Sequence, residues 1–167
     1  MKNNCLTAKN ILLENDYTCV LYLNGIEYHS TLRGVKPLID FLESSIDFSG
    51  FSAADKVVGA GAAHLYVLLK VKSVWAKVIS EKAKKILQEN NISVFFEKEV
   101  PYIINRTGDG ACPIETAVMS ITNPNDALAT IKQTLKKHNN KIKRFKSGYI
   151  CICFLFTYKT NCGIIYK

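Results

Sequence analysis

The chain has 167 residues, of which 48% are hydrophobic and 22% charged, values close to the averages of globular proteins. This length and balance fit one domain of ordinary size and exclude a disordered chain, a collagen-like repeat and a coiled coil. The first ten residues lack the apolar region of a secretory signal, and no stretch reaches the roughly 18 apolar residues of a membrane helix. We therefore expect a cytoplasmic protein without membrane contact, whose six cysteines are reduced thiols.

The net charge of +8 is unevenly distributed along the chain. Residues 127–167 contain nine Lys or Arg and no Asp or Glu, whereas residues 1–126 carry a net charge of −1. An electrostatic argument for an acidic partner therefore applies to the C-terminal segment alone. We accordingly divide the chain into a core domain, residues 1–138, and a basic and apolar extension, residues 139–167.

The N-terminal third of the chain predicts a helix, a hairpin and a second helix. Apolar residues at helical spacing indicate helices over Leu6–Asn15 and Val35–Ser44. Between them, strands are expected over Thr18–Leu23 and Ile26–Ser30. They flank Asn24-Gly25, a dipeptide typical of a two-residue hairpin turn.

The middle of the chain predicts a buried central helix over Ser52–Leu69. It opens with Ser-Ala-Ala-Asp, a capping-box pattern in which Ser52 is the cap and Asp55 follows three residues later. Its interior consists almost entirely of Val, Ala, Gly and Leu, and a helix that is apolar on every side is expected to be buried on most of them.

Beyond this helix, strands and helices alternate. The expected elements are, in order, strand, helix, strand, loop, helix and helix: Ser73–Ile79, Ser80–Glu89, Ser93–Glu97, Val100–Ala111, Cys112–Ser120 and Asn123–His138. This alternation favours an α/β fold, a three-layer α/β/α sandwich around a mixed sheet of about four to five strands with parallel members.

Three long motifs cover much of the chain: S-T-L-R-G-V-K-P-L at Ser30–Leu38, D-F-S-G-F-S-A-A-D-K-V-V-G at Asp47–Gly59, and I-I-N-R-T-G-D-G-A-C-P-I-E-T-A-V at Ile103–Val118. They resemble domain-of-unknown-function family 1893, a bacterial family placed in the cytidine-deaminase-like superfamily. The resemblance spans residues of about 6–136 and implies a cytidine-deaminase-like fold. It implies no activity, because the family has none established.

The superfamily implies a zinc site for which this sequence lacks ligands. Zinc deaminases hold the metal with H-x-E or C-x-E at the start of one buried helix and with P-C-x-x-C at the start of a later one. The predicted helix starts here, Ser52–Lys56 and Ser80-Glu81, contain neither His nor Cys, whereas zinc prefers a tetrahedral set of nitrogen and sulfur ligands. We therefore expect no metal and no other cofactor. His64, inside the apolar helix, is interpreted as a packed core residue or a surface histidine.

Lys56 is the first candidate binding residue, because it is expected in the first turn of a helix, where the helix dipole disfavours a cation. A lysine there suits an anion-binding role, with the helix amides as further donors. The alternative is an ion pair with a neighbouring acid or a surface lysine. Asp55 is more simply explained as a cap. Arg33 also precedes a helix, so an anion-binding role competes with a turn-and-surface role, and the latter is favoured.

Cys112 is a candidate nucleophile, because a thiol at a helix N-terminus can have a lowered pKa. Glu115 would oppose this if its carboxylate lay close to the thiol. The alternative is a structural capping arrangement formed by Cys112 and Glu115.

The loop Asn105–Gly110 combines Arg106, Asp109 and two glycines. Arg106 is suited to clamp a carboxylate or phosphate through two hydrogen bonds, and loops before helices often carry binding sites. The alternative is a tight turn held in shape by an Arg106–Asp109 pair.

Three predicted helix starts are expected to meet in one cleft at the carboxyl ends of the strands: Ser52–Lys56, Ser80-Glu81 and Cys112–Glu115. This predicts a metal-independent site for a small anion or a nucleotide-like ligand, held by Lys56 and Arg106. The further candidates for ligand contact are Ser52, Ser80, Glu81, Glu115 and Arg33. Lys56, Cys112, Asp55 and Asp109 are the catalytic candidates if a reaction occurs.

Two competing hypotheses remain. The first is a non-catalytic nucleic-acid or protein-binding module that uses the basic segment Lys132–Lys146. The second is a redox or sulfur-handling protein that uses Cys112. The sequence assigns neither a reaction nor an oligomeric state.

Overall fold

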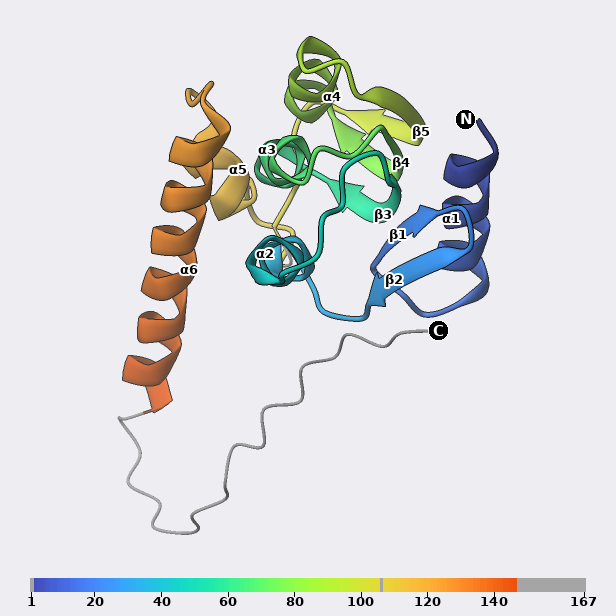
Figure 1. Cartoon of the computed structure of the whole chain (residues 1–167). Coiled ribbons are helices and arrows are strands. Elements are labelled where there is room, and N and C mark those ends of the chain that lie inside the picture. The colour runs from blue at the N-terminus through green and yellow to red at the C-terminus, as the bar shows by residue number, and fades with distance from the viewer. Residues whose placement is uncertain (1, 106, 147–167) are drawn as a thin grey trace, which may run out of the picture.

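The computed structural model describes residues 2–105 and 107–146, and five strands in these residues form one mixed sheet in the order β2-β1-β3-β4-β5 (Figure 1). Along the chain, the elements are α1 (Lys2–Glu14), β1 (Cys19–Leu23), β2 (Ile26–Ser30), α2 (Lys36–Glu43), β3 (Ser52–Val58), α3 (Ala60–Leu68), β4 (Ser73–Ser80), α4 (Glu81–Glu89), β5 (Ser93–Val100), α5 (Pro113–Val118) and α6 (Pro124–Lys146). β1 pairs antiparallel with β2 and β3, whereas β3, β4 and β5 are parallel. The predicted α/β fold with a mixed sheet is confirmed.

Helices cover both faces of the sheet. On one face, α1 packs Ala8 and Leu12 against Val20, Ala54 and Trp75 of the strands. The opposite face is covered by α2, α3 and α4, and α5 and α6 pack on the outer side of α3 (Figure 1). The three-layer α/β/α arrangement is therefore confirmed.

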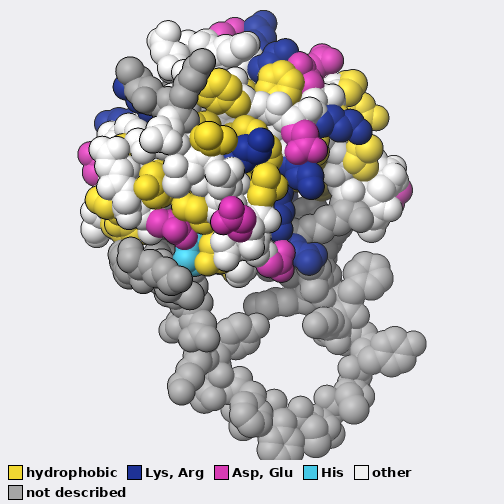
Figure 2. All heavy atoms as spheres, turned by 90° about the vertical axis from the view of Figure 1, so that its right-hand side faces the viewer, with side chains coloured by type: hydrophobic (Ala, Val, Ile, Leu, Met, Phe, Trp, Pro, Cys, Tyr) yellow, Lys and Arg dark blue, Asp and Glu magenta, His cyan; other side chains and the backbone are white. Residues whose placement is uncertain are grey.

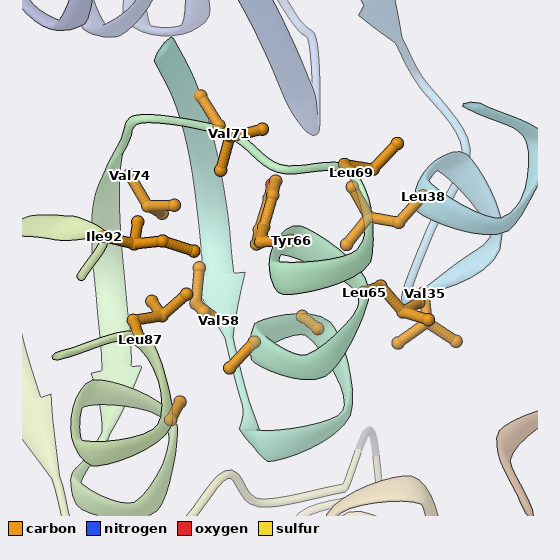
Figure 3. Close-up of a cluster of buried hydrophobic side chains, with 14 of the residues drawn as sticks. Val35, Leu38, Val58, Leu65, Tyr66, Leu69, Val71, Val74, Leu87 and Ile92 are labelled. Carbon is orange, nitrogen blue, oxygen red and sulfur yellow. The ribbon is translucent and has the colours of Figure 1, made fainter. Parts of the chain in front are cut away.

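The main hydrophobic core lies between the sheet and α3. Figure 3 shows Tyr66 of α3 on the side of Val58 of β3, Val74 of β4 and Leu87 of α4, whereas Leu65 of α3 points to the other side, toward α2. All five side chains are fully buried. Burial of a large aliphatic or aromatic side chain stabilises the fold by about 1.5–3 kcal/mol, so this cluster fixes α3 on the sheet.

The predicted hairpin is confirmed. β1 and β2 pair with Leu23 opposite Ile26, so that Asn24 and Gly25 form a two-residue turn. Both turn residues have positive φ, 47° and 94°, which Asn and Gly adopt more readily than other residues. The local turn chemistry therefore determines the register of these two strands.

The predicted helix over Ser52–Leu69 is wrong in its first part, because Ser52–Val58 forms β3 and α3 begins only at Ala60. β3 is a central strand that pairs with β1 and β4, and its neighbouring residues Ala53 and Ala54 are buried on opposite faces. A strand buried on both faces is as uniformly apolar as a buried helix, so periodicity does not distinguish the two. The capping box is wrong as well, because Ser52 accepts a hydrogen bond from the Ser73 hydroxyl at 2.8 Å within the sheet.

The C-terminal helix is longer than predicted. α6 runs from Pro124 to Lys146 and crosses the expected boundary between residues 138 and 139 without a break. The division into a core domain and an extension stays a prediction, because residues 147–167 lie outside the described residues. None of the helices in residues 2–105 and 107–146 combines the length and apolar character of a membrane-spanning helix.

The charged side chains of the body are mixed in sign. On the described part of the face in Figure 2, Lys and Arg are interspersed with Asp and Glu and with hydrophobic side chains. This agrees with the net charge of −1 for residues 1–126. A mixed surface of this kind gives no electrostatic reason to expect an acidic macromolecule on that face.

Candidate functional site

The carboxyl ends of β3 and β4 meet at one edge of the sheet, where α3 and α4 begin. β3 ends at Val58, and Gly59 precedes the first residue of α3. β4 ends at Ser80, whose side chain caps α4 by accepting a hydrogen bond from the Ala83 N–H at 3.2 Å. The predicted helix start at Ser80 is confirmed. Ser52 lies at the other end of β3, roughly 20 Å away at about 3.3 Å per residue, so the structure does not bring it to Ser80.

The side chain that reaches the start of α3 comes from α5. Glu115 lies in the first turn of α5 and is 2% exposed. Its carboxyl oxygen Oε2 lies against Gly59, so close that a Cβ at residue 59 would overlap it. The same Cβ would lie 3.1 Å from Cγ1 of Ile103. Glycine at residue 59 is therefore what allows Glu115 to approach the backbone at the helix start.

The Glu115 carboxyl is incompletely satisfied. Burial raises its pKa, while the Ser80 hydroxyl and the backbone amides of Ala60 and Ile103 act in the opposite direction. Within the described residues, neither oxygen has a partner in hydrogen-bond geometry. A buried polar group without a partner costs about 1–3 kcal/mol, and more when it is charged. The carboxyl is thus held close to donors that do not fully pair with it.

His64 is a second unpaired polar side chain on α3, one turn beyond the helix start. It is 1% exposed, and neither ring nitrogen has a hydrogen-bond partner in the part of the chain that the structure describes. Burial lowers its pKa, and the charge of Lys82 acts in the same direction, whereas the backbone of Ile121 opposes them. His64 is therefore a buried core residue, in agreement with one of its two predicted roles.

Asp55 belongs to a buried network between β1, β3 and α3. It accepts hydrogen bonds from the Tyr66 hydroxyl at 2.8 Å and from the Val57 N–H at 3.0 Å, and Cys19 Sγ lies 3.3 Å from the Tyr66 oxygen. Burial raises the pKa of Asp55 to about 7, and it also raises the pKa values of Cys19 and Tyr66. The predicted capping role of Asp55 is wrong, because the residue lies inside a strand.

Lys56 lies on the surface, outside any helix. Its Nζ is 3.1 Å from Asp16 Oδ1 in the connection between α1 and β1, and the Asp16 side chain is fully exposed. The argument from the helix dipole therefore does not apply, and the structure shows the alternative interpretation, an ion pair with a neighbouring acid. Arg33 and Glu81 are also exposed. Arg33 precedes Gly34, which has a φ of 69° and forms the turn before α2.

The loop that contains Asp109 is a tight turn. Asn105 Nδ2 and Thr107 Oγ1 donate to Asp109 Oδ1 at 2.7 and 2.5 Å, and the Gly108 N–H donates to Asn105 Oδ1 at 2.9 Å. These hydrogen bonds lower the pKa of Asp109. Asn105 and Asp109 thus shape the turn. Arg106 lies outside the described residues, so its pairing with Asp109 and its role as an anion clamp stay predictions.

Cys112 lies at the base of this loop. Its N–H donates to the Ile103 carbonyl at 2.8 Å, and Ile104 pairs with Ala111 one residue further out. Ile103, where the loop begins, lies with the Glu115 carboxyl against Gly59. The Cys112 side chain makes no capping hydrogen bond, and Glu115 reaches α3, so the alternative capping arrangement of these two residues is not formed. The nucleophilic role of Cys112 stays a prediction.

The two helix starts do not fit zinc. α3 begins with Gly59-Ala60-Gly61 and α4 with Ser80-Glu81-Lys82, and the Glu115 carboxyl fills the space that a side chain at residue 59 would need. Among the described residues, no group of three or more His, Cys, Asp or Glu side chains is placed to hold a metal ion. A zinc site needs about four His, Cys, Asp or Glu ligands around one point, and the described residues of these helix starts do not supply them.

The sequence does not indicate that Gly59 and Ile103 surround the Glu115 carboxyl, or that Tyr66 contacts the Asp55 carboxyl. The only local sign for Gly59 is its position after the apolar pair Val57-Val58, where a glycine marks a break between a strand and a helix. The contacts of Ile103 and Tyr66 join residues far apart in the chain, and no local pattern indicates them.

The family model and one solved structure point to the same family. The model of TM1506, domain of unknown function (DUF1893), matches residues 7–135. The crystal structure of a DUF1893 family protein, TM1506 from Thermotoga maritima, is similar with a TM-score of 0.71 at 27% identity, covering 82% of this chain and 91% of that chain. A dCMP deaminase from the cyanophage S-TIM5 has a TM-score of 0.37 at 13% identity, covering 59% of this chain and 95% of that chain. A search of curated proteins finds no match. The chain belongs to the TM1506 family, a domain of unknown function (DUF1893).

Proposed function

We propose that the chain binds a small nucleotide-like ligand at the carboxyl ends of β3 and β4, using protein groups and no resident zinc. The observation that carries this proposal is the buried Glu115 carboxyl, whose two oxygens lack partners within the described residues at the first turn of α3. Natural proteins pair nearly all their buried polar groups, so an exception calls for an explanation. A buried acid with a raised pKa at the edge of a sheet is typical of a functional site.

The location supports the proposal independently of Glu115. In open α/β sheets, ligands bind beyond the carboxyl ends of the strands, and here two parallel strands end side by side. The first amides of α3 are oriented to attract a negative group, and Gly59 contributes no capping side chain of its own. Ser80, at the start of α4, adds a hydroxyl.

A nucleotide-like ligand matches both kinds of group at this place. Its phosphate is an anion that suits a helix N-terminus, and its base carries N–H donors that suit a carboxylate acceptor. The loop that contains Asp109, Cys112 and Arg106 begins at Ile103, beside Glu115, which supports keeping these three residues as candidates for ligand contact. The proposal is one of binding, and it assigns no reaction.

The test is a binding screen on the full chain with nucleosides, nucleotides and small organic acids, first by thermal shift and then by calorimetry. Ser80→Ala is expected to weaken a hit about tenfold, since removing one hydrogen bond to a charged group costs on the order of 1.5 kcal/mol. Ser93→Ala is the matched control, because Ser93 is an exposed serine at the opposite end of the parallel strands. Binding that survives Ser80→Ala but is lost in Lys56→Ala would place the ligand elsewhere and contradict the proposal.

A second candidate function rests on the length of α6. The helix continues to Lys146, so seven Lys or Arg residues between residues 132 and 146 belong to one continuous element. Lys132 is already paired with Glu43 of α2 at 2.8 Å, so any phosphate contacts would come from the residues after it. Binding of this kind weakens steeply between 50 and 200 mM salt, roughly three-hundredfold for six phosphate contacts to a single strand. Fluorescence anisotropy with labelled single-stranded RNA measures it, and an affinity insensitive to salt would contradict it.

A further inference from the structure

We infer that the N-terminus of α3 is a binding site for a small carboxylate, and that the chain's own Glu115 occupies this site in the structure described here. The inference rests on the proposed function, because it concerns the regulation of the same ligand site at the start of α3. An acidic ligand must displace Glu115 to bind there. It identifies Glu115 as an internal competitor for the amides of α3, which accepts from the base of the ligand only after the ligand's anion has displaced it from them.

The first argument is that the α3 helix start lacks a cap of its own. α3 has nine residues, and its N-cap Gly59 has an extended backbone and no side chain. The first N–H groups of a helix have no partner inside the helix and favour an acceptor or an anion. Glu115, from a helix more than fifty residues later in the chain, brings a carboxyl to this place. Its oxygens are buried and unpaired within the described residues, so the chain supplies an anion without fully binding it.

The second argument is that the packing of α5 on α3 delivers Glu115 to this place. A Cβ at Gly61 would lie 2.5 Å from Cγ2 of Ile114, so α5 contacts α3 directly where α3 has no side chain. A Cβ at Gly59 would overlap Oε2 of the next residue, Glu115. Gly59, the N-cap of α3, and Gly61 in its first turn therefore make room for the consecutive side chains Glu115 and Ile114 of α5.

The third argument is the set of donors around this space. The Ser80 hydroxyl and the backbone amides of Ala60 and Ile103 come from three separate segments, and all favour the charged form of the carboxyl. Donors near a helix N-terminus suit a carboxylate in general, and none of these three is in hydrogen-bond geometry with Glu115, so nothing in the set is specific for a glutamate side chain. If Glu115 is shortened, a free carboxylate of the right size should take its place.

The experiment is chemical rescue of Glu115→Ala in the full chain. This substitution removes Cγ and the carboxyl group, which are the two carbons and two oxygens of acetate. We expect the variant to unfold at a lower temperature than the native chain. Acetate that exceeds its dissociation constant several-fold should raise the unfolding temperature by about 2–4 °C relative to chloride at equal ionic strength.

Glu115→Gln is the matched comparison, because glutamine fills the same space and leaves no room for acetate. Glu89→Ala is the control for loss of an acid, since Glu89 is exposed and pairs only with Lys85, at 3.8 Å, among the ion pairs of the described residues. Neither variant should respond to acetate more than the native chain does. An equal acetate response in all variants would overturn the inference. A response of Glu115→Ala to phosphate alone would also overturn it, because the site would then not be one for a carboxylate.

Gly59→Ala keeps the experiment decisive if Glu115→Ala does not fold. The added methyl group overlaps Oε2, which is the mobile end of a side chain, so it should push the carboxyl away from α3. The pKa of Glu115, followed by carbon-13 NMR, should then return toward its ordinary value as the carboxyl reaches solvent. An unchanged pKa would overturn the placement of Glu115. Rescue by acetate without any hit in the ligand screen would contradict the proposed function but not this inference. A hit in the ligand screen without rescue by acetate would contradict only this inference.

Discussion

Two carboxyl groups are buried against α3, and the protein treats them in opposite ways. Asp55 lies beside Tyr66, near the end of the helix, and accepts two hydrogen bonds. Glu115 lies beside Ala60, at the first residue, and has no partner in hydrogen-bond geometry within the described residues. Burial raises the pKa of both. The comparison teaches that burial alone does not mark a site: a paired acid holds elements together, and an unpaired acid indicates an unmet requirement for a partner.

The largest expected effect is the pH dependence caused by Asp55. Its pKa is about 7 in the folded chain and 3.8 when unfolded, so the folded state holds the proton more tightly. The free energy of unfolding should therefore decrease as the pH rises from about 4 to about 7, by on the order of 4 kcal/mol from this group, and stay level above that range. Asp55→Asn should remove this decrease. Urea titrations at several pH values measure it, and an equally steep decrease in the variant would contradict the assignment.

Tyr66→Phe should have the next largest effect. The substitution keeps the ring in the core but removes the hydroxyl that donates to Asp55 at 2.8 Å. Leaving a buried acceptor without this donor should destabilise the fold by about 1–3 kcal/mol. The loss should be greater above pH 7, where Asp55 is ionised, than near pH 5. Tyr22→Phe on β1 is the tyrosine control, because Tyr22 packs against the cluster on the opposite face of the sheet. A loss independent of pH would show that the hydroxyl does not act through Asp55.

The sequence predicts some of the elements around Asp55 and misses others. Local turn chemistry correctly predicts the hairpin, and the helix start at Ser80 follows from capping preferences. The strand Ser52–Val58 was missed, because a central strand that is apolar on both faces has no period that separates it from a buried helix. That error moved the expected start of α3 by eight residues and with it the supposed place of Lys56 and Asp55.

Glu115 shows the complementary case. Sequence reasoning correctly placed it at a helix start after the loop, and counted it among the ligand-binding candidates. It paired Glu115 with Cys112 nearby in the chain, because local patterns connect only neighbours. The contact with Gly59 depends on how α5 packs on α3, a tertiary feature. For the same reason, nothing local connects Asp55 to Tyr66 or Cys19.

Glu115→Gln should change stability less than either substitution in the Asp55 network. The amide has nearly the shape of the carboxyl and does not carry a buried charge, so we expect a change in the free energy of unfolding within about 1 kcal/mol. Because burial raises the pKa of Glu115, any difference should favour the variant as the pH rises. Chemical denaturation at pH 5 and pH 8 measures this. A loss of unfolding free energy as large as that of Tyr66→Phe would show that Glu115, like Asp55, makes hydrogen bonds that stabilise the fold.

Lys56→Ala should have the smallest effect, although the sequence made this residue the leading candidate. Its partner Asp16 is fully exposed, and a surface ion pair of this kind contributes about 0–1 kcal/mol. We expect a change of at most about 0.5 kcal/mol in low salt and less at 0.5 M NaCl, where exposed pairs are screened. Ligand affinity in the screen should be unchanged, since no contact connects Lys56 to the residues around Glu115 among the hydrogen bonds and ion pairs of the described chain. A large loss of affinity would mean that the ligand contacts the α1–β1 connection instead of the start of α3.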